Sequence, residues 1–99
     1  MLNNKNLLIT GGTGSLGKAL TSHILNKYPK INKLVIFSRD EQKQFLMAQE
    51  FPTNLYPQVR FLIGNVRDKE RLVRAFKDVD YVIHAAAMKH VHIAEYNPD

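Results

Sequence analysis

The chain has 99 residues, of which 44% are hydrophobic and 23% charged, a composition typical of a small soluble globular domain. No apolar run approaches the roughly 20 residues of a membrane-spanning helix, the segment before the first glycine is too short for a signal-peptide core, and the absence of cysteine excludes disulfides and thiolate metal sites. The net charge of +5 suits anionic ligands such as phosphates, but it is spread along the chain and does not indicate nucleic acid. We therefore expect one cytoplasmic domain, with neither a membrane nor a nucleic acid as its partner.

The first half of the chain predicts a strand, a helix and a second strand. Residues 6–10 form a short apolar run stopped by Gly11-Gly12, as in a parallel strand buried between helices. A helix follows and ends at Tyr28-Pro29, because proline disfavours helical geometry in the residue before it. Residues 33–38 are the second strand. The apolar residues at helical spacing in the helix are Leu16, Ala19, Leu20, Ile24 and Leu25.

The second half repeats this alternation. A helix is predicted from about Asp40 to Phe51, residues 59–63 form a third strand closed by Gly64, and residues 80–84 form a fourth strand. Between the last two strands, Asp68 is a suitable cap for a third helix. The buried side of the second helix is expected to draw on Phe45, Leu46, Met47 and Ala48, and that of the third on Leu72, Val73 and Phe76.

Strands that alternate with helices predict an α/β fold with a parallel sheet and right-handed crossovers. The expected architecture is a Rossmann-type sheet of strand order 3-2-1-4, with helices on both faces. The chain stops before any helix that would cover the outer side of the fourth strand, so the sheet is expected to be truncated there. An uncovered strand flank invites association, and self-association through this edge is a further expectation.

The glycine turn between the first strand and the first helix reads Thr-Gly-Gly-Thr-Gly-Ser-Leu-Gly from Thr10 to Gly17. Gly11 allows a tight turn out of the strand, Gly14 allows the backbone to approach a pyrophosphate, and Gly17 allows helix and strand to pack. The helix N-terminus adds free N–H groups and the positive end of its dipole. The alternative is a purely structural turn. A P-loop is excluded, because no Gly-Lys-Ser/Thr follows.

The end of the second strand favours NADP over NAD. Enzymes that use NAD place an acid at this point to bind the ribose 2′-hydroxyl, whereas this chain has Ser38 and Arg39, with Lys43 one helical turn further on. A hydroxyl and two cations suit a 2′-phosphate. The alternative makes Ser38 and Glu41 a capping box, with Arg39 and Lys43 as solvated charges.

Three weaker signals follow the third and fourth strands. Asn65 is positioned to hydrogen-bond an adenine edge through its amide, although asparagine is also an ordinary turn residue. The triplet Ala85-Ala86-Ala87 leaves room for the cofactor, or simply packs well. Lys89 at the ligand edge suits a substrate phosphate or carboxylate, although exposed lysines are usually solvated.

A metal site is not expected, because His84, His90 and His92 have no carboxylate or cysteine at a plausible spacing apart from Glu95.

Together these residues resemble the extended short-chain dehydrogenase/reductases, and within them the inverting UDP-N-acetylglucosamine 4,6-dehydratases of the polysaccharide-biosynthesis type. The likeness covers essentially the whole chain. Its specific blocks are Thr10 to Gly17, Ser38-Arg39-Asp40-Glu41 with Lys43, Met47 to Phe51, Gly64 to Asp68, His84 to Val91, and Ala94 to Pro98.

The resemblance implies an NADP-dependent lyase that acts on a UDP-sugar, with Lys89 as a substrate contact. Such enzymes remove a hydride from sugar C4, lose water across C5 and C6, and return the hydride at C6. The residues expected to line NADP, from the resemblance and the glycine turn together, are Gly11, Thr13, Gly14, Ser15, Leu16, Gly17, Ser38, Arg39, Asp40, Glu41, Gln42, Lys43, Asn65, Val66, Ala85 and Ala86.

The chain departs from the family in two residues and in length. Asn65 stands where the family usually has aspartate, and His92 where it usually has proline. The family's Tyr-x-x-x-Lys or equivalent catalytic set lies downstream, and no tyrosine here has a lysine four residues later. We therefore expect residues 1–99 to be the N-terminal part of an NAD(P)-binding Rossmann domain without catalytic residues of its own. The alternatives are a related UDP-sugar 4-epimerase, a non-catalytic nucleotide-binding or interaction module, and a remnant without function.

Overall fold

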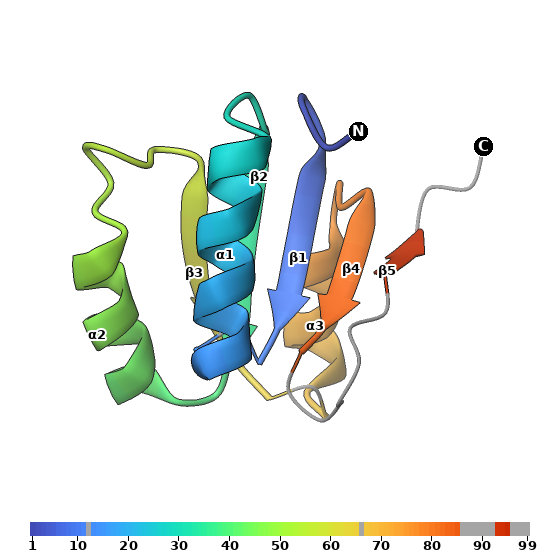
Figure 1. Ribbon diagram of the computed structural model, residues 1–99. Helices are drawn as coiled ribbons and strands as arrows, with labels where there is room; N and C mark the ends of the chain where they lie inside the picture. Colours follow the sequence, from blue (N-terminus) through green and yellow to red (C-terminus); the bar gives the residue numbers. More distant parts are fainter. Residues whose placement is uncertain (12, 66, 86–92, 96–99) are drawn as a thin grey trace.

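A computed structural model describes residues 1–11, 13–65, 67–85 and 93–95. The helices and strands follow one another in the predicted order (Figure 1). They are β1 (Asn6–Thr10), α1 (Ser15–Lys27), β2 (Lys33–Ser38), α2 (Glu41–Glu50), β3 (Val59–Ile63), α3 (Lys69–Phe76), β4 (Tyr81–His84) and β5 (Ile93–Glu95). All four predicted strands and all three predicted helices are confirmed. None of the helices in the described part of the chain is long and apolar enough to cross a membrane.

The sheet has the order β3-β2-β1-β4-β5, and its first four strands are parallel. The predicted order 3-2-1-4 is therefore confirmed. The sequence predicted that the sheet would end at β4, but the structure adds one more strand. β5 pairs with β4 in antiparallel fashion, with Ile93 opposite Ile83. A strand edge presents unpaired N–H and C=O groups, and β5 satisfies those of β4. Three residues are too few to be recognised as a strand from their pattern.

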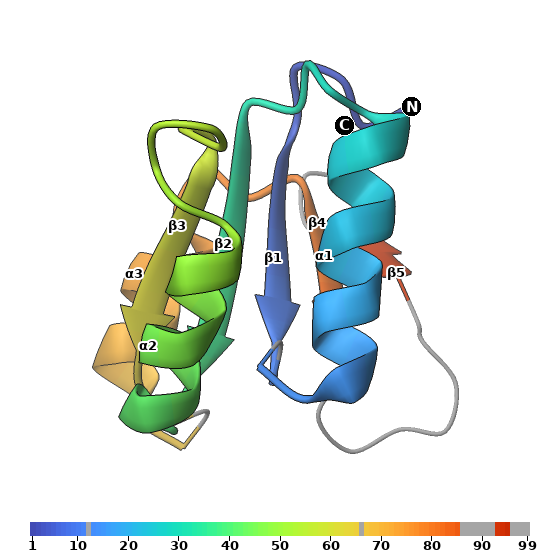
Figure 2. The same ribbon diagram turned by 60° about the vertical axis from the view of Figure 1, so that its left-hand side comes forward.

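Helices cover both faces of the sheet, with α1 and α2 on one side and α3 on the other (Figures 1 and 2). In β1 the side chains alternate between the faces, as the pleat of a strand requires. Leu7 and Ile9 join the core beneath α1 and α2, while Leu8 joins the core beneath α3. All three side chains are fully buried. The continuous apolar run of β1 thus reflects a strand that packs against helices twice.

The helix faces differ from the prediction. In α2, Phe45 is 64% and Leu46 51% exposed, and the buried positions are Gln44 and Met47. In α3, Val73 is 70% exposed, while Leu72 and Phe76 pack on the sheet as predicted. Short helices carry apolar residues on more than one face, and the pattern alone did not identify which face the sheet covers.

In α1, Leu16 and Ala19 are exposed, whereas Ile24 and Leu25 are buried as predicted. Thr21 takes an inward position instead. This polar residue is tolerated there because its Oγ1 donates to Gly17 O at 2.8 Å, so the hydroxyl is not left without a partner.

Asp68 caps α3 as predicted, because its Oδ1 accepts a hydrogen bond from the backbone N–H of Arg71 at 3.2 Å. We expect Asp68→Ala to lower the free energy of unfolding by about 1 kcal/mol, the usual loss for a removed N-cap. Urea denaturation followed by circular dichroism measures this change. Asp68→Asn is the matched control, since asparagine caps as well as aspartate. An equal loss in both variants would contradict the capping role.

Candidate functional site

The carboxyl ends of the parallel strands lie at one edge of the sheet, the lower edge in Figure 1. Thr10 is in register with Phe37 and His84, and Ser38 is in register with Ile63. The turns that follow β1, β2 and β3 consequently meet at this edge, and the backbone N–H of Ala85 bonds to Thr10 O at 3.0 Å. Ligands of open α/β sheets bind outside the carboxyl ends of the strands. The predicted cofactor residues among those described are therefore gathered where such a ligand would sit.

Gly11 and Gly14 shape the turn between β1 and α1. Gly11 has φ 66°, a left-handed conformation that favours glycine, and its N–H bonds to Phe37 O at 2.8 Å. Gly14 is the N-cap of α1 and receives no side-chain cap. Apart from Gly14 and its two chain neighbours, no atom of the described residues would lie within 4 Å of a Cβ built on Gly14. The backbone of Gly14 therefore faces open space, beside the N–H groups that begin α1.

The other predicted residues of this turn divide by exposure. Ser15 and Leu16, in the first turn of α1, are exposed, with Leu16 at 40%. Thr13 and Gly17 are buried, so their side of the turn is closed to a ligand. Because the first N–H groups of a helix have no intrahelical acceptor, the exposed start of α1 can donate to an anion.

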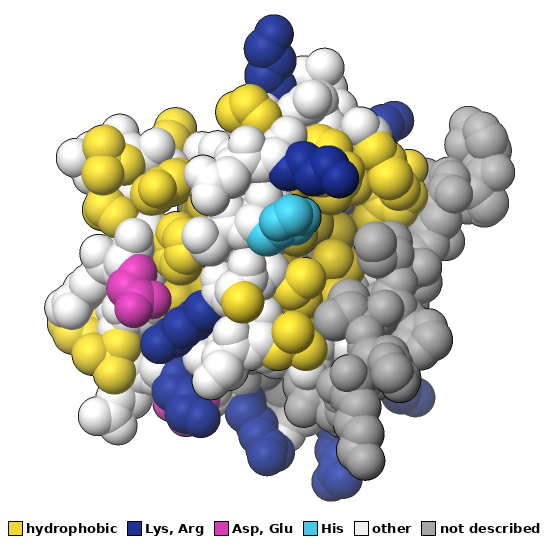
Figure 3. All heavy atoms as spheres, viewed as in Figure 1, with side chains coloured by type: hydrophobic (Ala, Val, Ile, Leu, Met, Phe, Trp, Pro, Cys, Tyr) yellow, Lys and Arg dark blue, Asp and Glu magenta, His cyan; other side chains and the backbone are white. Residues whose placement is uncertain are grey.

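Ser38, Arg39 and Lys43 lie at the end of β2 and the start of α2. Ser38 is buried at 7% exposure, whereas Arg39 and Lys43 are exposed, as are Glu41 and Gln42. Within the described part of the chain, the one ion pair joins Lys18 Nζ and Glu50 Oε2 at 3.9 Å. Neither Arg39 nor Lys43 forms an ion pair with another residue in this part of the chain. Lys and Arg side chains also gather along the lower edge of the surface in Figure 3.

The capping box of Ser38 and Glu41, the alternative considered from the sequence, is wrong. The N-cap of α2 is Asp40, and its Oδ1 accepts from the backbone N–H of Lys43 at 3.0 Å. Ser38 is still part of β2 and lies too early to cap the helix. Its hydroxyl is occupied by a different partner, the side chain of Gln44.

Gln44 is the residue of this site that the sequence analysis missed. Its side chain is 4% exposed, and Nε2 lies 2.9 Å from Ser38 Oγ, 2.9 Å from Leu62 O and 3.3 Å from Ser38 O. The amide therefore joins α2 to the ends of β2 and β3. The available signal was its spacing, since Gln44 precedes the buried Met47 by three residues and so shares its face.

Asn65 follows β3 and organises the turn that leads to α3. Its Oδ1 accepts from the N–H of Arg67 at 2.9 Å, and its carbonyl oxygen accepts from the N–H of Asp68 at 2.9 Å. These bonds are those of an asparagine that shapes a turn. The side chain is exposed, and its contact with adenine stays a prediction.

Gly64 is enclosed by side chains. A Cβ placed there would lie 2.8 Å from Arg71 Cδ and 2.9 Å from Phe37 Cζ. The Arg71 side chain is able to move, but Phe37 is 1% exposed and belongs to the core beneath α3. We expect Gly64→Ala to reduce the free energy of unfolding by about 1–3 kcal/mol, the usual cost of overpacking. Urea denaturation measures this loss when Gly64→Ala is introduced into the wild type and into an Arg71→Ala variant. If Gly64→Ala cost no stability in the Arg71→Ala variant, Phe37 would not resist the methyl group.

At the end of β4, the ring of His84 is tied to the neighbouring strand. His84 Nδ1 lies 3.0 Å from Thr10 Oγ1, and Ala85, the next residue, is buried at 9% exposure. The predicted residues Val66, Ala86 and Lys89 lie outside the described residues, as do His90 and His92.

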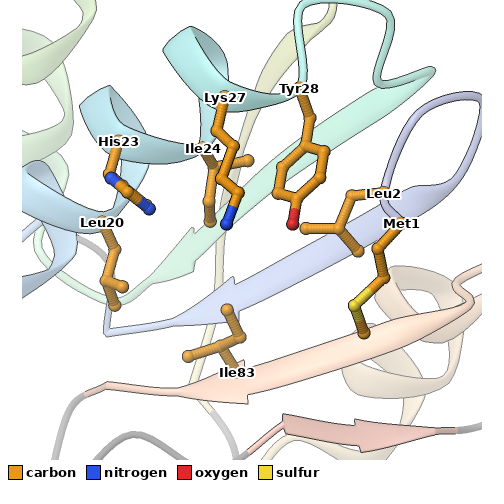
Figure 4. A pocket seen from close by; sticks show the side chains of 8 residues that line it. All are labelled: Met1, Leu2, Leu20, His23, Ile24, Lys27, Tyr28 and Ile83. Atoms are coloured by element: carbon orange, nitrogen blue, oxygen red, sulfur yellow. The ribbon is translucent and has the colours of Figure 1, made fainter.

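A shallow hollow lies elsewhere, between α1, the start of the chain and β4 (Figure 4). Its lining includes Leu20, Ile24 and Ile83, with His23 and Lys27 from α1. None of the predicted cofactor residues that the structure describes lines it. The hollow is therefore separate from the edge described above.

Comparison with known proteins gives consistent matches. The model of the family described as "Polysaccharide biosynthesis protein" matches residues 7–99. The inverting UDP-N-acetylglucosamine 4,6-dehydratase of Campylobacter jejuni subsp. jejuni serotype O:2 is 63% identical over 98 residues, which cover 99% of this chain and 28% of that protein. The UDP-glucose 4-epimerase of Rickettsia bellii is 46% identical over 100 residues, which cover 99% of this chain and 28% of that protein.

A solved structure shows the same fold. The X-ray structure of Pen from Bacillus thuringiensis superposes with a TM-score of 0.79 at 41% identity, over 91% of this chain and 27% of that one. The chain thus spans little more than a quarter of the length of the proteins that it matches.

Proposed function

The chain belongs to the polysaccharide biosynthesis protein family, and on that premise we propose that it binds the dinucleotide NADP at the carboxyl edge of its sheet. The pyrophosphate would lie against the glycine turn at the start of α1. The adenosine ribose, with its 2′-phosphate, would lie beside Ser38 and Arg39. The described cofactor residues proposed from the sequence all lie at this edge.

The observation that carries the proposal is the open backbone at Gly14. Among the described residues, no atom beyond Gly14 and its two chain neighbours lies within 4 Å of the position that a Cβ would occupy, and the helix that begins at Ser15 has no side-chain cap. A phosphate satisfies such free N–H groups and interacts favourably with the positive end of the helix dipole. A glycine turn with only a structural purpose would not need an open surface at this position.

The preference for NADP over NAD is supported by the charges at the end of β2. Arg39 and Lys43 are exposed and form no ion pair among the residues that the structure describes. The carboxylate that directly follows Arg39 in the sequence, that of Asp40, accepts a hydrogen bond from the backbone N–H of Lys43. A 2′-phosphate has acceptor oxygens that suit a guanidinium, so the site offers a donor where NAD enzymes offer an acid.

For the longer protein of which such a segment would form part, we propose a nucleotide-sugar dehydratase that uses a UDP-sugar. NADP held by the glycine turn, Ser38 and Arg39 would supply the hydride transfer of this reaction, in which sugar C4 loses a hydride, water is lost across C5 and C6, and C6 regains the hydride. The 63% identical relative carries the name of a UDP-N-acetylglucosamine 4,6-dehydratase. Residues 1–99 would supply cofactor binding, and Lys89 a contact with the UDP-sugar, without catalysing on their own.

A UDP-sugar 4-epimerase is the second candidate, favoured by the 46% identical relative of that name. Both activities begin with removal of the hydride from C4, so the cofactor site alone is compatible with either. Two further expectations stay predictions. They are the cytoplasmic location and self-association through the outermost strand of the sheet on the side of β4.

Calorimetric titration of NADP and NAD into the purified chain tests the proposal, with circular dichroism to establish folding. We expect saturable binding that is tighter for NADP. A folded chain that binds neither dinucleotide would favour the interaction module, and an unfolded chain would assign the function to a longer polypeptide.

A further inference from the structure

The orientation of the Gln44 amide is fixed by its surroundings. Leu62 O and Ser38 O are carbonyl oxygens, which only accept hydrogen bonds. They lie 2.9 and 3.3 Å from Gln44 Nε2, so the NH₂ group, and not Oε1, must face them. The same nitrogen lies 2.9 Å from Ser38 Oγ. Gln44 therefore donates to the hydroxyl of Ser38, and the hydroxyl accepts.

A hydroxyl that accepts one bond keeps its own hydrogen for another acceptor. Among the described residues, Ser38 Oγ has no hydrogen-bond partner other than Gln44 Nε2, which donates to it and cannot accept its hydrogen. Ser38 is the last residue of β2, at the edge where the strands end, and Arg39 follows it. The hydrogen of the Ser38 hydroxyl is thus not committed to an acceptor among the described residues, and Ser38 lies at the end of β2, where the ribose and its 2′-phosphate are proposed to bind.

We propose that Gln44 is a positioning residue that makes Ser38 a hydrogen-bond donor and so favours a phosphate at the ribose 2′ position. This inference rests on the proposed dinucleotide function. A phosphate that carries its full charge offers only acceptors, which a committed donor and a guanidinium both satisfy. A ribose hydroxyl gains less from this arrangement, because its bond to Ser38 is not charge-assisted. Gln44 acts through Ser38 and does not itself contact the ligand.

The test compares variants of the full chain by one ratio, the dissociation constant for NAD divided by that for NADP. A high ratio means a preference for NADP. Ser38→Ala removes the donor, and we expect this ratio to fall about tenfold or more, the loss of a hydrogen bond to a charged group. Gln44→Met keeps the size of the side chain but removes its NH₂ group, and the ratio should fall about three- to tenfold, a neutral hydrogen bond. Gln49→Met is the matched control, because Gln49 is an exposed residue of the same helix, and its ratio should equal that of the wild type.

The double variant separates positioning from an independent effect. If Gln44 acts through the hydroxyl, Gln44→Met should not lower the ratio further once Ser38 is alanine. Fold-changes that multiply in the double variant would overturn the proposal, and so would an unchanged ratio in Ser38→Ala.

A measurement on the wild-type chain decides the matter should Gln44→Met not fold. Saturating NADP should shift the side-chain ¹⁵N–¹H signals of Gln44 more than saturating NAD does, and Ser38→Ala should remove the difference. Equal shifts would overturn the role of Gln44 while leaving the proposed function intact. A folded wild-type chain that binds neither dinucleotide would overturn both.

Discussion

Replacement of Gly14 by alanine is expected to weaken dinucleotide binding about 5- to 150-fold, the equivalent of the 1–3 kcal/mol that one extra methyl group costs in a filled space. The wild-type backbone at this residue has φ −77° and ψ 178°, a conformation that any residue adopts. No described residue other than Gly14 and its chain neighbours reaches within 4 Å of the new Cβ. The methyl group would therefore meet only a ligand that lies against the turn.

Stability should change little in the same variant. Alanine is a poorer N-cap than glycine, but it also restricts the unfolded chain by about 0.4–1 kcal/mol, so the two effects offset one another. Calorimetric titration and urea denaturation of Gly14→Ala measure the two quantities separately. Gly64→Ala is the informative comparison, since its added methyl group meets Phe37 and should reduce stability instead. Unchanged affinity in a folded Gly14→Ala chain would mean that no phosphate approaches this backbone.

The strands and the strand order were predictable because each depends on a pattern that the fold requires everywhere. The first strand is apolar at the consecutive positions 7–9, and the structure uses that property on both faces, with Leu8 in one core and Leu7 and Ile9 in the other. A strand that packs on one side only would alternate. Alternation of such strands with helices then leaves few possible topologies.

The inward faces of the helices were less predictable, because they depend on the position of each helix over the sheet. Phe45 was expected to be buried and is 64% exposed, whereas the polar Gln44 is buried beside Met47. The side chain of Gln44 is stable there because two carbonyl oxygens and a hydroxyl lie within reach of its amide. Those acceptors come from β2 and β3, and their approach to α2 is a property of the tertiary structure.

The sequence predicted those residues of the candidate site that lie where a strand ends or in the turn after it. The glycine turn, Ser38-Arg39 and Asn65 were each assigned from their position after an apolar run, and parallel pairing brings those positions to one edge. The sequence did not reveal which partner each polar group has. Ser38 bonds to Gln44 and not to the start of α2, and Asn65 bonds to its own turn. Such local choices depend on distances of a few tenths of an ångström.

Replacement of Arg39 by alanine is the prediction that distinguishes the two cofactors. We expect the affinity for NADP to fall by on the order of 1.5–3 kcal/mol, the contribution of a charge-assisted hydrogen bond, and the affinity for NAD to change much less. The guanidinium is exposed and has no carboxylate partner among the described residues, so its removal leaves no buried charge behind. The free energy of unfolding should stay within about 0.5 kcal/mol of the wild type, as for most surface substitutions.

Titration calorimetry with both dinucleotides, at two salt concentrations, measures this difference. The preference of the wild type for NADP should shrink as salt is added, because exposed charges are screened, and Arg39→Ala should show less of this dependence. Lys30→Ala is the charge-matched control, since Lys30 is exposed in the turn before β2, at the opposite edge of the sheet. It removes one positive charge without touching the proposed site. Equal weakening of NADP and NAD by Arg39→Ala would show that Arg39 does not contact a 2′-phosphate, because only that group distinguishes the two ligands.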